Sequence, residues 1–267
     1  MGADIKKLKT RIKSVDSTLH LTKAMGLVAS SKIKRATDAM MKSREYADTI
    51  TDAVSMLTAC RECEKSPYLK KGDGKNTCLI IIAGDRGLAG GYNANIFRLA
   101  KEIRADEVIP IGKRACDRYG SEPVLAETFR YLDALELSKE LCTRFSEGEF
   151  DRVGILCTNY VSIMSQEAQI KWILPLEKNE NPNPISIVFE PDEITVLNSA
   201  IYEYIAALIV AAVRESYASE VAARRVAMDS AGKNAQQMLD DLYLDYNRAR
   251  QGAITQEITE IVAGSDA

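Results

Sequence analysis

Apolar residues recur with a helical period at both ends of the chain. Near the N-terminus they alternate between spacings of three and four residues, which is the pattern of a coiled-coil seam: Ile5, Leu8, Ile12, Val15 and Leu19. Near the C-terminus a similar stripe consists of Ala231, Ala235, Met238, Leu242, Ala249 and Ala253. We expect the two helices to pack against each other, since alanine allows close helix approach.

Proline positions divide the chain into three parts. All seven prolines lie between positions 67 and 191. Because proline lacks an N–H group and clashes with the preceding turn, it is excluded from helix interiors. Residues 2–60 and 195–264 can therefore each form one long helix. The expected division is a coiled-coil shaft of residues 1–60 and 195–267, with a base domain of residues 61–194.

The middle of the chain alternates between strand-like and helix-like segments. This alternation predicts a mainly parallel sheet covered by helices on both faces. The fold class is therefore α/β: a long antiparallel coiled coil of the terminal helices plus a small doubly wound sheet domain, Rossmann-like in its order of elements. The expected strands are 77–83, 107–111, 153–158, 168–174 and 185–189, and the expected helices are 93–104, 113–119 and 133–146.

Composition and charge narrow the function classes. A net charge of -3 and 6% aromatic residues indicate neither a nucleic-acid binder nor a disordered tail. Residues 1–35 hold nine Lys or Arg against two Asp, whereas residues 214–267 hold six basic against nine acidic residues, so the two ends are electrostatically complementary. Without a signal peptide or an uninterrupted apolar run of about 18–20 residues, we expect no direct membrane insertion.

The six cysteines lack the spacing of a disulfide framework, and we interpret them as free thiols of a reducing compartment. Cys60 and Cys63 form a C-x-x-C pair that leaves three alternatives open: half of a zinc site, a redox pair, or incidental thiols near a helix end. A zinc site would need two further ligands, and the only histidine is His20. We expect no metal and no cofactor.

The glycine-rich stretch "GDRGLAGGYNANI", residues 84–96, lies between an expected strand and an expected helix. Strand, glycine loop and helix often form a phosphate cradle from backbone N–H groups. The spacing G-x-x-G-x-x-G-G matches neither the Walker A motif nor the dinucleotide fingerprint, and Asp85 places a carboxylate at the loop mouth. Three interpretations stay open: a nucleotide site, a tight turn, or a surface pressed against a partner.

The sequence contains few features that would indicate an enzyme. The sequence contains no G-x-S-x-G or H-E-x-x-H motif, and the single histidine is expected to be a packed or surface residue rather than a base. The basic run "KIKRA", residues 32–36, is either a solvated helix face or a contact for an acidic partner, and no aromatic residue interleaves its lysines as nucleic-acid binding would favour.

Five blocks of sequence together resemble the gamma subunit of the rotary F-type ATP synthase, of bacterial type. They occur in the family's order and spacing and span both ends and the middle of the chain. The blocks are "LTKAMGLVASSKIKRA" (21–36), "GDRGLAGGYNANI" (84–96), "FEPDE" (189–193), "ASEVAARRVAMDSA" (218–231) and "YNRARQGAITQEITEIVAG" (246–264).

The resemblance implies a central rotor shaft without catalytic residues. Its terminal helices would turn inside the hexamer of alpha and beta subunits. The base domain would lie near the epsilon subunit and the ring of c subunits, with the delta subunit contacted only indirectly. Ion flow would turn the shaft and change the nucleotide affinity of each beta subunit in turn. The implied location is the cytoplasmic side of the cell membrane, where the subunit is peripheral.

The resemblance also implies roles for individual residues. Beta-subunit catch contacts are Arg250, Gln251 and Thr255; beta-lever contacts are Met25, Arg224, Asp85, Arg86 and Ala89; the foot contact to the c ring is Glu190; and the contacts to a hydrophobic sleeve are Ile254, Ile258, Ile261 and Val262. For each polar position the plain alternative is a solvated helix or loop residue. For the apolar tail the alternative is the core of the coiled coil.

Two departures from the family pattern limit what the resemblance implies. Gly84 stands where the family often has serine or threonine, and Ala89 stands where it often has cysteine, so no redox role follows from that position. Two other functions stay open from the residues alone: an enzyme with a doubly wound nucleotide domain, and a coiled-coil scaffold unrelated to energy conversion. Tight nucleotide binding by the isolated chain would favour the enzyme.

Overall fold

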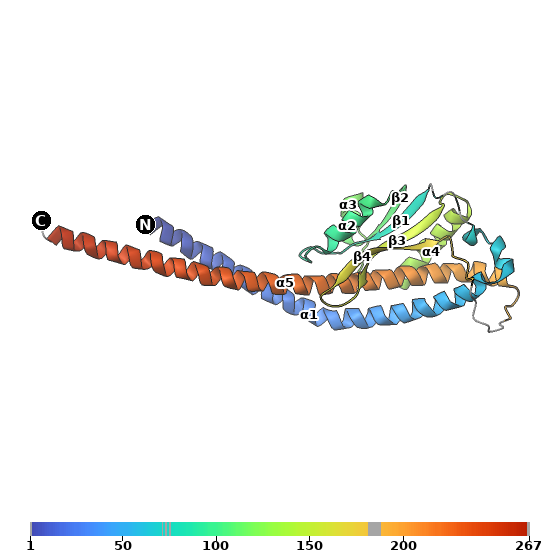
Figure 1. Ribbon diagram of the computed structural model, residues 1–267, viewed down its shortest axis with the longest axis horizontal. Helices are drawn as coiled ribbons and strands as arrows, with labels where there is room; N and C mark the ends of the chain where they lie inside the picture. Colours follow the sequence, from blue (N-terminus) through green and yellow to red (C-terminus); the bar gives the residue numbers. More distant parts are fainter. Residues whose placement is uncertain (1, 71, 73, 75, 181–187, 266–267) are drawn as a thin grey trace. The chain divides into compact units, whose positions relative to one another are not determined.

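The computed structural model describes residues 2–70, 72, 74, 76–180 and 188–265 (Figure 1). The chain divides into two compact units. Residues 1–30 and 224–267 make up the first, called the helical unit, and residues 31–223 make up the second, called the sheet unit. Two long helices, α1 (Gly2–Thr58) and α5 (Glu193–Ser265), contribute to both units. The boundaries at residues 60 and 195, between shaft and base, stay a prediction.

The helical unit consists of the outer parts of α1 and α5. Its core contains Ile12 and Leu19 of α1 with Ala235, Leu239 and Leu242 of α5. Contacts at two glycines fix the helix direction. A Cβ atom at Gly232 would lie 3.6 Å from Thr22 Oγ1, and one at Gly26 would lie 3.7 Å from Met228 Cβ. Since the α5 partner moves backwards as α1 advances, the two helices run antiparallel, as the sequence predicts.

One member of the expected C-terminal stripe is wrong. Met238 is 44% exposed, whereas the neighbouring Leu239 is 4% exposed and lies in the helical core. The buried α5 positions Ala235, Leu239 and Leu242 follow spacings of four and three, which a coiled-coil seam requires. Met238 and Leu239 are adjacent large apolar residues, and the sequence alone does not distinguish them. The register of the coiled-coil seam places Leu239 in the core.

The sheet unit contains four strands in the order β2-β1-β3-β4. Strand β1 pairs in parallel with β2 and with β3, and β4 runs antiparallel to β3 at the edge. The expected mainly parallel sheet is therefore confirmed. The described strands and short helices are β1 (Thr77–Ile82), α2 (Tyr92–Glu102), β2 (Glu107–Ile111), α3 (Lys113–Tyr119), α4 (Tyr131–Ser146), β3 (Arg152–Tyr160) and β4 (Gln166–Leu174), with 3-10 turns at Arg61–Lys65 and Pro67–Leu69.

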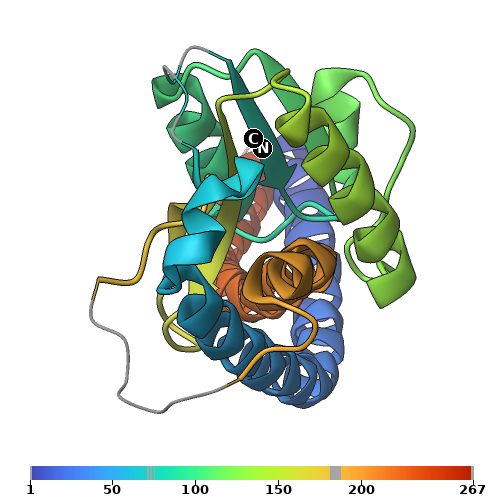
Figure 2. The ribbon, with the colours of Figure 1, turned by 90° about the vertical axis from the view of Figure 1, so that its right-hand side faces the viewer.

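Helices cover both faces of the sheet (Figures 1 and 2). Alternate residues of β1 explain the two layers, because successive side chains of a strand point to opposite faces. Ile80 and Ile82 pack toward α4 and α5, in a cluster with Leu141 and Ile205. Leu79 and Ile81 pack toward α2 and α3, in a cluster with Ile96 and Ala115.

One expected strand does not appear in the described part of the chain. The prediction covered 185–189, of which residues 185–187 lie outside the described residues. Val188 and Phe189 belong to no strand. Among the described residues, β4 is the last strand and α5 is the next element of regular structure.

Candidate functional site

The glycine loop leaves β1 at its carboxyl end and is fixed by the carboxylate of Asp85. This carboxylate accepts backbone hydrogen bonds from Lys113 at 3.2 Å, Ala126 at 2.9 Å and Glu127 at 2.8 Å. Asp85 is only 8% exposed. Its carboxylate therefore satisfies the first N–H group of α3 and two N–H groups of the segment before α4, and the side chain points into the sheet unit.

A second carboxylate, that of Glu220 on α5, occupies the backbone donors of the loop. Its two oxygens accept the N–H groups of Asp85 and Arg86, each at 3.2 Å. Glu220 is 1% exposed. A Cβ atom at Gly84 would lie 2.9 Å from the Glu220 carboxyl carbon, so glycine is needed for the carboxylate to approach. The loop is thus an anion cradle whose anion belongs to the same chain, which disfavours a nucleotide site.

The outer surface of the glycine loop consists of Arg86 and Leu88. The Arg86 side chain is 67% exposed, and its guanidinium lies 3.7 Å from Glu127 Oε2. Leu88 is 63% exposed and has a φ of 61°, which is uncommon for a residue other than glycine. By contrast, Ala89 is 3% exposed, so its side chain faces the interior of the unit. Sequence reasoning missed Leu88, whose backbone conformation leaves no mark in the sequence.

An ion pair connects the basic run of α1 to this region. Lys32 Nζ lies 2.6 Å from Glu127 Oε1. The hydrogen bond from Lys32 holds the pKa of the Glu127 carboxyl below its ordinary value. Lys32 therefore contacts an acidic group within the chain, whereas Lys34 and Arg35 are exposed. Two basic side chains of the run therefore form a solvated helix face, and contact with an acidic partner stays a prediction.

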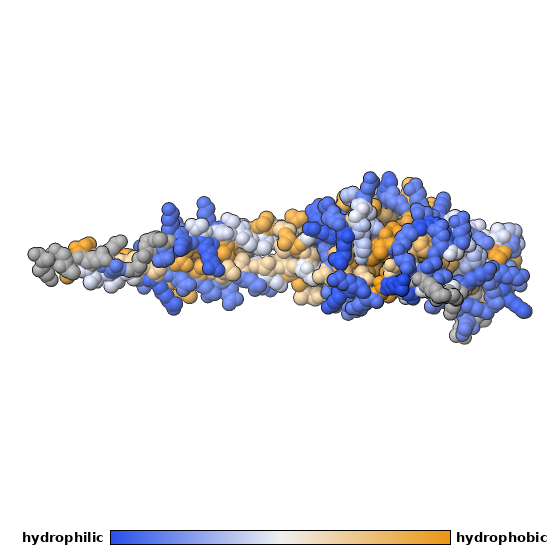
Figure 3. Space-filling view, turned by 90° about the horizontal axis from the view of Figure 1, so that it is seen from above, coloured by the Kyte–Doolittle hydropathy of each residue, from blue (hydrophilic) through white to orange (hydrophobic). Residues whose placement is uncertain are grey.

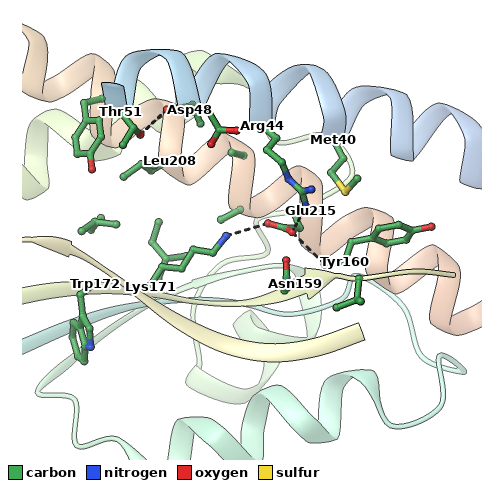
Figure 4. Close-up of a pocket in the computed structure, with 17 residues that line it drawn as sticks. Met40, Arg44, Asp48, Thr51, Asn159, Tyr160, Lys171, Trp172, Leu208 and Glu215 are labelled. Carbon is green, nitrogen blue, oxygen red and sulfur yellow. Dashed lines mark hydrogen bonds and ion pairs between the residues drawn. The ribbon is translucent and has the colours of Figure 1, made fainter. Parts of the chain in front are cut away.

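A third buried carboxylate, that of Glu215, joins α5 to α1 and to the sheet (Figure 4). Its Oε1 accepts from Arg44 Nη2 of α1 at 2.6 Å and from the Tyr160 N–H at 3.2 Å. Its Oε2 accepts from Lys171 Nζ of β4 at 3.2 Å. Sequence reasoning missed Glu215 and Glu220. Each is an acidic residue within an otherwise apolar helix segment, and this pattern could have revealed them. A charged side chain in such a segment is expected to be paired, because charged side chains are almost never fully buried without a partner.

Met25 and Arg224 lie in the helical unit, close to the contact between Gly26 and Met228. Both side chains are partly buried. Large apolar side chains next to Met25 on α1 are exposed: Leu21 is 60%, Leu27 73% and Val28 54% exposed. Apolar surface therefore lies among polar patches along these helices (Figure 3), which is typical of a surface that a partner covers.

The C-terminal part of α5 exposes both its polar and its apolar predicted contacts. Arg250, Gln251 and Thr255 are exposed, and the Thr255 hydroxyl donates to the Gln251 carbonyl oxygen at 2.9 Å, within the helix. The four sleeve residues are Ile254 (43% exposed), Ile258 (56%), Ile261 (72%) and Val262 (55%). None of the four belongs to the described core of the helical unit, so the alternative of a coiled-coil core is disfavoured.

Glu190 is exposed and lies three residues before α5 begins. It is followed by Pro191 across a cis peptide bond. Asp192 caps the start of α5, since its carboxylate accepts from the Thr195 N–H at 2.9 Å. Glu190 is thereby presented at the N-terminal end of α5, separate from the glycine loop in sequence.

The cysteine pair does not form a metal site among the described residues, which contain no group of three potential ligands. Cys63 is buried and Cys60 is partly buried. Burial, with the nearby Cys60 and acidic side chains, raises the pKa of the Cys63 thiol to about 11. Burial also raises the pKa of Cys60. A thiol with a raised pKa forms little thiolate and therefore reacts poorly. The interpretation of Cys60 and Cys63 as incidental thiols is therefore favoured.

Helix α5 contains a segment that by length and composition alone could cross a membrane, within Glu193–Gln256. The same helix supplies Ile201, Ile205 and Ile209 to the core of the sheet unit, each with no exposed surface. The apolar composition of α5 is therefore explained by its packing against the sheet.

Comparisons with known proteins identify the family. The family model described as ATP synthase matches residues 4–267. The ATP synthase gamma chain of Ruminococcus albus is 40% identical over 98% of this chain and 98% of its own length. The chain belongs to the ATP synthase gamma-chain family. A relative from Acetobacterium woodii, a gamma chain named as sodium ion specific, is 33% identical and covers 100% of this chain and 99% of its own.

Chains of solved mitochondrial ATP synthase structures share the fold. A chain from the Euglena gracilis mitochondrial ATP synthase (OSCP/F1/c-ring) has a TM-score of 0.68 at 18% identity and covers 100% of this chain and 95% of its own. A chain from the central stalk and c-ring of the Tetrahymena thermophila mitochondrial ATP synthase has a TM-score of 0.64 at 23% identity. The match covers 79% of this chain and 99% of that chain. As a member of the gamma-chain family, the protein is a non-catalytic central-stalk subunit of F-type ATP synthase.

Proposed function

We propose that the chain couples rotation of a membrane ring of c subunits to conformational change in beta subunits, as the shaft inside an alpha–beta hexamer. The observation that carries the proposal is the exposed apolar and polar surface of the C-terminal part of α5. Ile254, Ile258 and Ile261 are 43–72% exposed, a cost in water that a surrounding partner removes. Arg250, Gln251 and Thr255 supply hydrogen-bonding groups beside them for the beta-subunit catch.

Lever contacts are proposed for each unit by itself. On the helical unit, Met25 and Arg224 are the proposed contacts, supported by the exposed Leu27 and Val28 beside them. On the sheet unit, the proposed contact is the glycine loop with Asp85, Arg86 and Ala89. Because Asp85 and Ala89 are buried, Arg86 presents the side chain and Asp85 holds the loop in place.

The foot of the shaft is proposed to lie at Glu190 and the start of α5, against the c ring and near the epsilon subunit. An exposed carboxylate at this position would meet hydrogen-bond donors of the c subunits. The complex would place the chain on the cytoplasmic side of the cell membrane, held there by its partners, with the delta subunit contacted only indirectly and nucleic acid not contacted. Whether protons or sodium ions drive the ring is decided in other subunits.

Torque requires a rigid joint between helix and sheet, and the three buried carboxylates supply one. Glu215 joins α5 to α1 and β4, Glu220 joins α5 to the glycine loop, and Asp85 joins that loop to α3. Hydrogen bonds to charged groups are stronger than neutral ones, about 1.5–3 kcal/mol each. The proposal therefore places force transmission in these hydrogen bonds.

The experiment that tests the catch contact changes Gln251 and Thr255 together to alanine. In a complex reconstituted with alpha and beta subunits, this variant is expected to lower ATP hydrolysis or assembly more than Cys60→Ser or Cys63→Ser. The reason is that Gln251 and Thr255 are exposed at the proposed contact, whereas Cys63 is buried and Cys60 is partly buried. Equal losses in all three variants would contradict the assignment, and failure of the wild-type chain to assemble would overturn the proposed function.

A further inference from the structure

A cavity of about 490 Å³ lies in the sheet unit, between α1, α5 and the strands β3 and β4 (Figure 4). Its walls come from three separate parts of the chain. Met40 and Arg44 belong to α1, Asn159 and Lys171 to the two strands, and Leu208 to α5. The volume is in the range of small-molecule sites, roughly 300–1,000 Å³. None of the predicted subunit contacts lines this cavity.

Positive charge gathers at one end of the cavity. Arg44 and Lys171 approach the two oxygens of the same carboxylate, that of Glu215, at 2.6 and 3.2 Å. Glu215 is nearly buried, whereas the Arg44 and Lys171 side chains remain 41% and 45% exposed. An arginine has five N–H donors and a lysine three, so most of their donors are not used by Glu215. One buried carboxylate balances only one of the two positive charges.

A polar side chain without a hydrogen-bond partner among the described residues lies beside this charge. Asn159 points into the cavity in Figure 4, and its side-chain amide makes no hydrogen bond to another described residue. Since Asn159 stands on β3 two residues beyond Cys157, it shares the face of the sheet that α5 covers. A partly buried amide is normally hydrogen-bonded, so a bound group would complete its pairing.

Apolar side chains also line the cavity. They are those of Leu208, Ala212, Ile155 and Ile173, together with Tyr204. The Tyr204 hydroxyl is hydrogen-bonded to Thr51. Trp172 points away, to the opposite face of the sheet (Figure 4). The cavity wall therefore combines cationic and hydrogen-bonding groups with apolar side chains.

We propose that this cavity binds a small monocarboxylate with a short apolar body. The carboxylate accepts from Arg44, Lys171 and Asn159, and the apolar body lies against Leu208 and Ile173. Asp48, an exposed carboxylate of α1 that also lines the cavity, repels more highly charged anions. Asp48 offsets the one positive charge by which Arg44 and Lys171 exceed Glu215, so the hydrogen-bond donors of Arg44, Lys171 and Asn159, rather than net charge, select the carboxylate.

The test uses the full chain with its methionine methyl groups labelled with ¹³C. Met40 lines the cavity and is 3% exposed, whereas Met164 lies outside it and is 76% exposed. Titration with hexanoate is expected to shift the Met40 methyl resonance saturably, with a Kd of about 1 mM, the affinity typical of so small a ligand. The Met164 resonance is expected to stay in place.

Two variants of the cavity and one matched control locate the binding. Lys171→Gln is expected to weaken hexanoate binding about tenfold by removing one charge. Ala211→Phe, which fills the cavity without changing charge, is expected to abolish the shift. Lys113→Gln removes a lysine that pairs with Asp117 on the exposed face of α3, and it is expected to leave the Kd unchanged.

Two related compounds decide whether the carboxylate is recognised. Hexylamine and hexanol have the same apolar body, and neither is expected to shift Met40 at the concentration at which hexanoate saturates it. An equal shift by either compound would overturn the proposal, because burial of the apolar body alone would then explain it. The absence of a saturable hexanoate shift, or an equal loss of affinity in Lys113→Gln, would also overturn it. Each result is independent of assembly with other subunits.

Discussion

At the residue scale, buried carboxylates determine how the glycine loop is built. Glu220 is 1% exposed and accepts the N–H groups of Asp85 and Arg86. The loop has the arrangement by which other proteins bind phosphate, with backbone donors after a strand and before a helix. Here the donors bind a side chain 134 and 135 residues away in the sequence. Gly84 therefore serves an intramolecular contact, whereas Leu88 and Arg86 are exposed and are the side chains that a partner would meet in the proposed function.

Glu220→Gln is expected to destabilise the full chain by about 2 kcal/mol, because the charge is lost and the NH₂ group of the amide would face one of the two backbone donors that the carboxylate now accepts. Urea unfolding of the purified chain, followed by circular dichroism, measures the change. Glu122→Gln, at an exposed loop position, is the matched control and is expected to leave the midpoint unchanged. Equal midpoints for the two variants would show that the carboxylate contributes nothing.

The buried thiols are expected to resist alkylation in the folded chain. The pKa of Cys63 is raised to about 11, so at pH 8 nearly all of it is the unreactive thiol. Iodoacetamide labelling followed by mass spectrometry should modify Cys63 far more slowly in buffer than in urea, where the pKa returns to about 8.5. Rapid labelling of Cys63 in the native chain would be inconsistent with this environment and would reopen the redox interpretation.

At the element scale, the absence of proline and the apolar spacing predict the two long helices. Which residues meet between the helices depends on the register of their packing. Sequence spacing predicted the α1 seam correctly, since Ile12 and Leu19 lie in the core of the helical unit. On α5 it predicted Met238 where Leu239 is buried. Two adjacent apolar residues satisfy almost the same helical period, and only the packed partner distinguishes them.

Gly232→Ala is expected to stabilise the helical unit by about 0.5–1 kcal/mol, because alanine favours the helix and its Cβ would lie 3.6 Å from Thr22 Oγ1, an ordinary contact. Gly84→Ala is the contrasting variant and is expected to destabilise the chain, because its Cβ would lie 2.9 Å from the Glu220 carboxyl carbon. Thermal unfolding of both variants compares the effects. A decrease in stability for Gly232→Ala would mean that the helices pack more tightly there than this distance indicates.

At the scale of the whole molecule, the two compact units differ in how their apolar side chains are buried. The sheet unit has its own clusters on both faces of the sheet, while the helical unit exposes large apolar side chains along its length. A central-stalk subunit needs a rigid base and a shaft surface shaped for its neighbours. The exposed apolar residues are a liability for the isolated chain, and the proposed contacts with partner subunits would cover them.

Deletion of residues 246–267 is expected to lower ATP synthesis in cells strongly, because it removes the exposed contacts from Arg250 to Val262. Residues 31–223 form a separate compact unit, so the truncated chain is expected to keep its folded sheet. ATP synthesis by membrane vesicles and the thermal unfolding of the purified chain measure the two effects. Unchanged synthesis would favour a scaffold unrelated to energy conversion.

The sequence by itself determined the elements and their order. The confinement of proline to positions 67–191 gave the long helices, and apolar runs gave four strands, because helix and strand formation depend on neighbouring residues. The tertiary structure decided how the elements are joined. Glu215 and its partner Arg44 are 171 residues apart, and such a pairing leaves no periodic trace in the chain. Burial made these carboxylates structural, and it also distinguished Arg86, which faces outward, from Asp85, which does not.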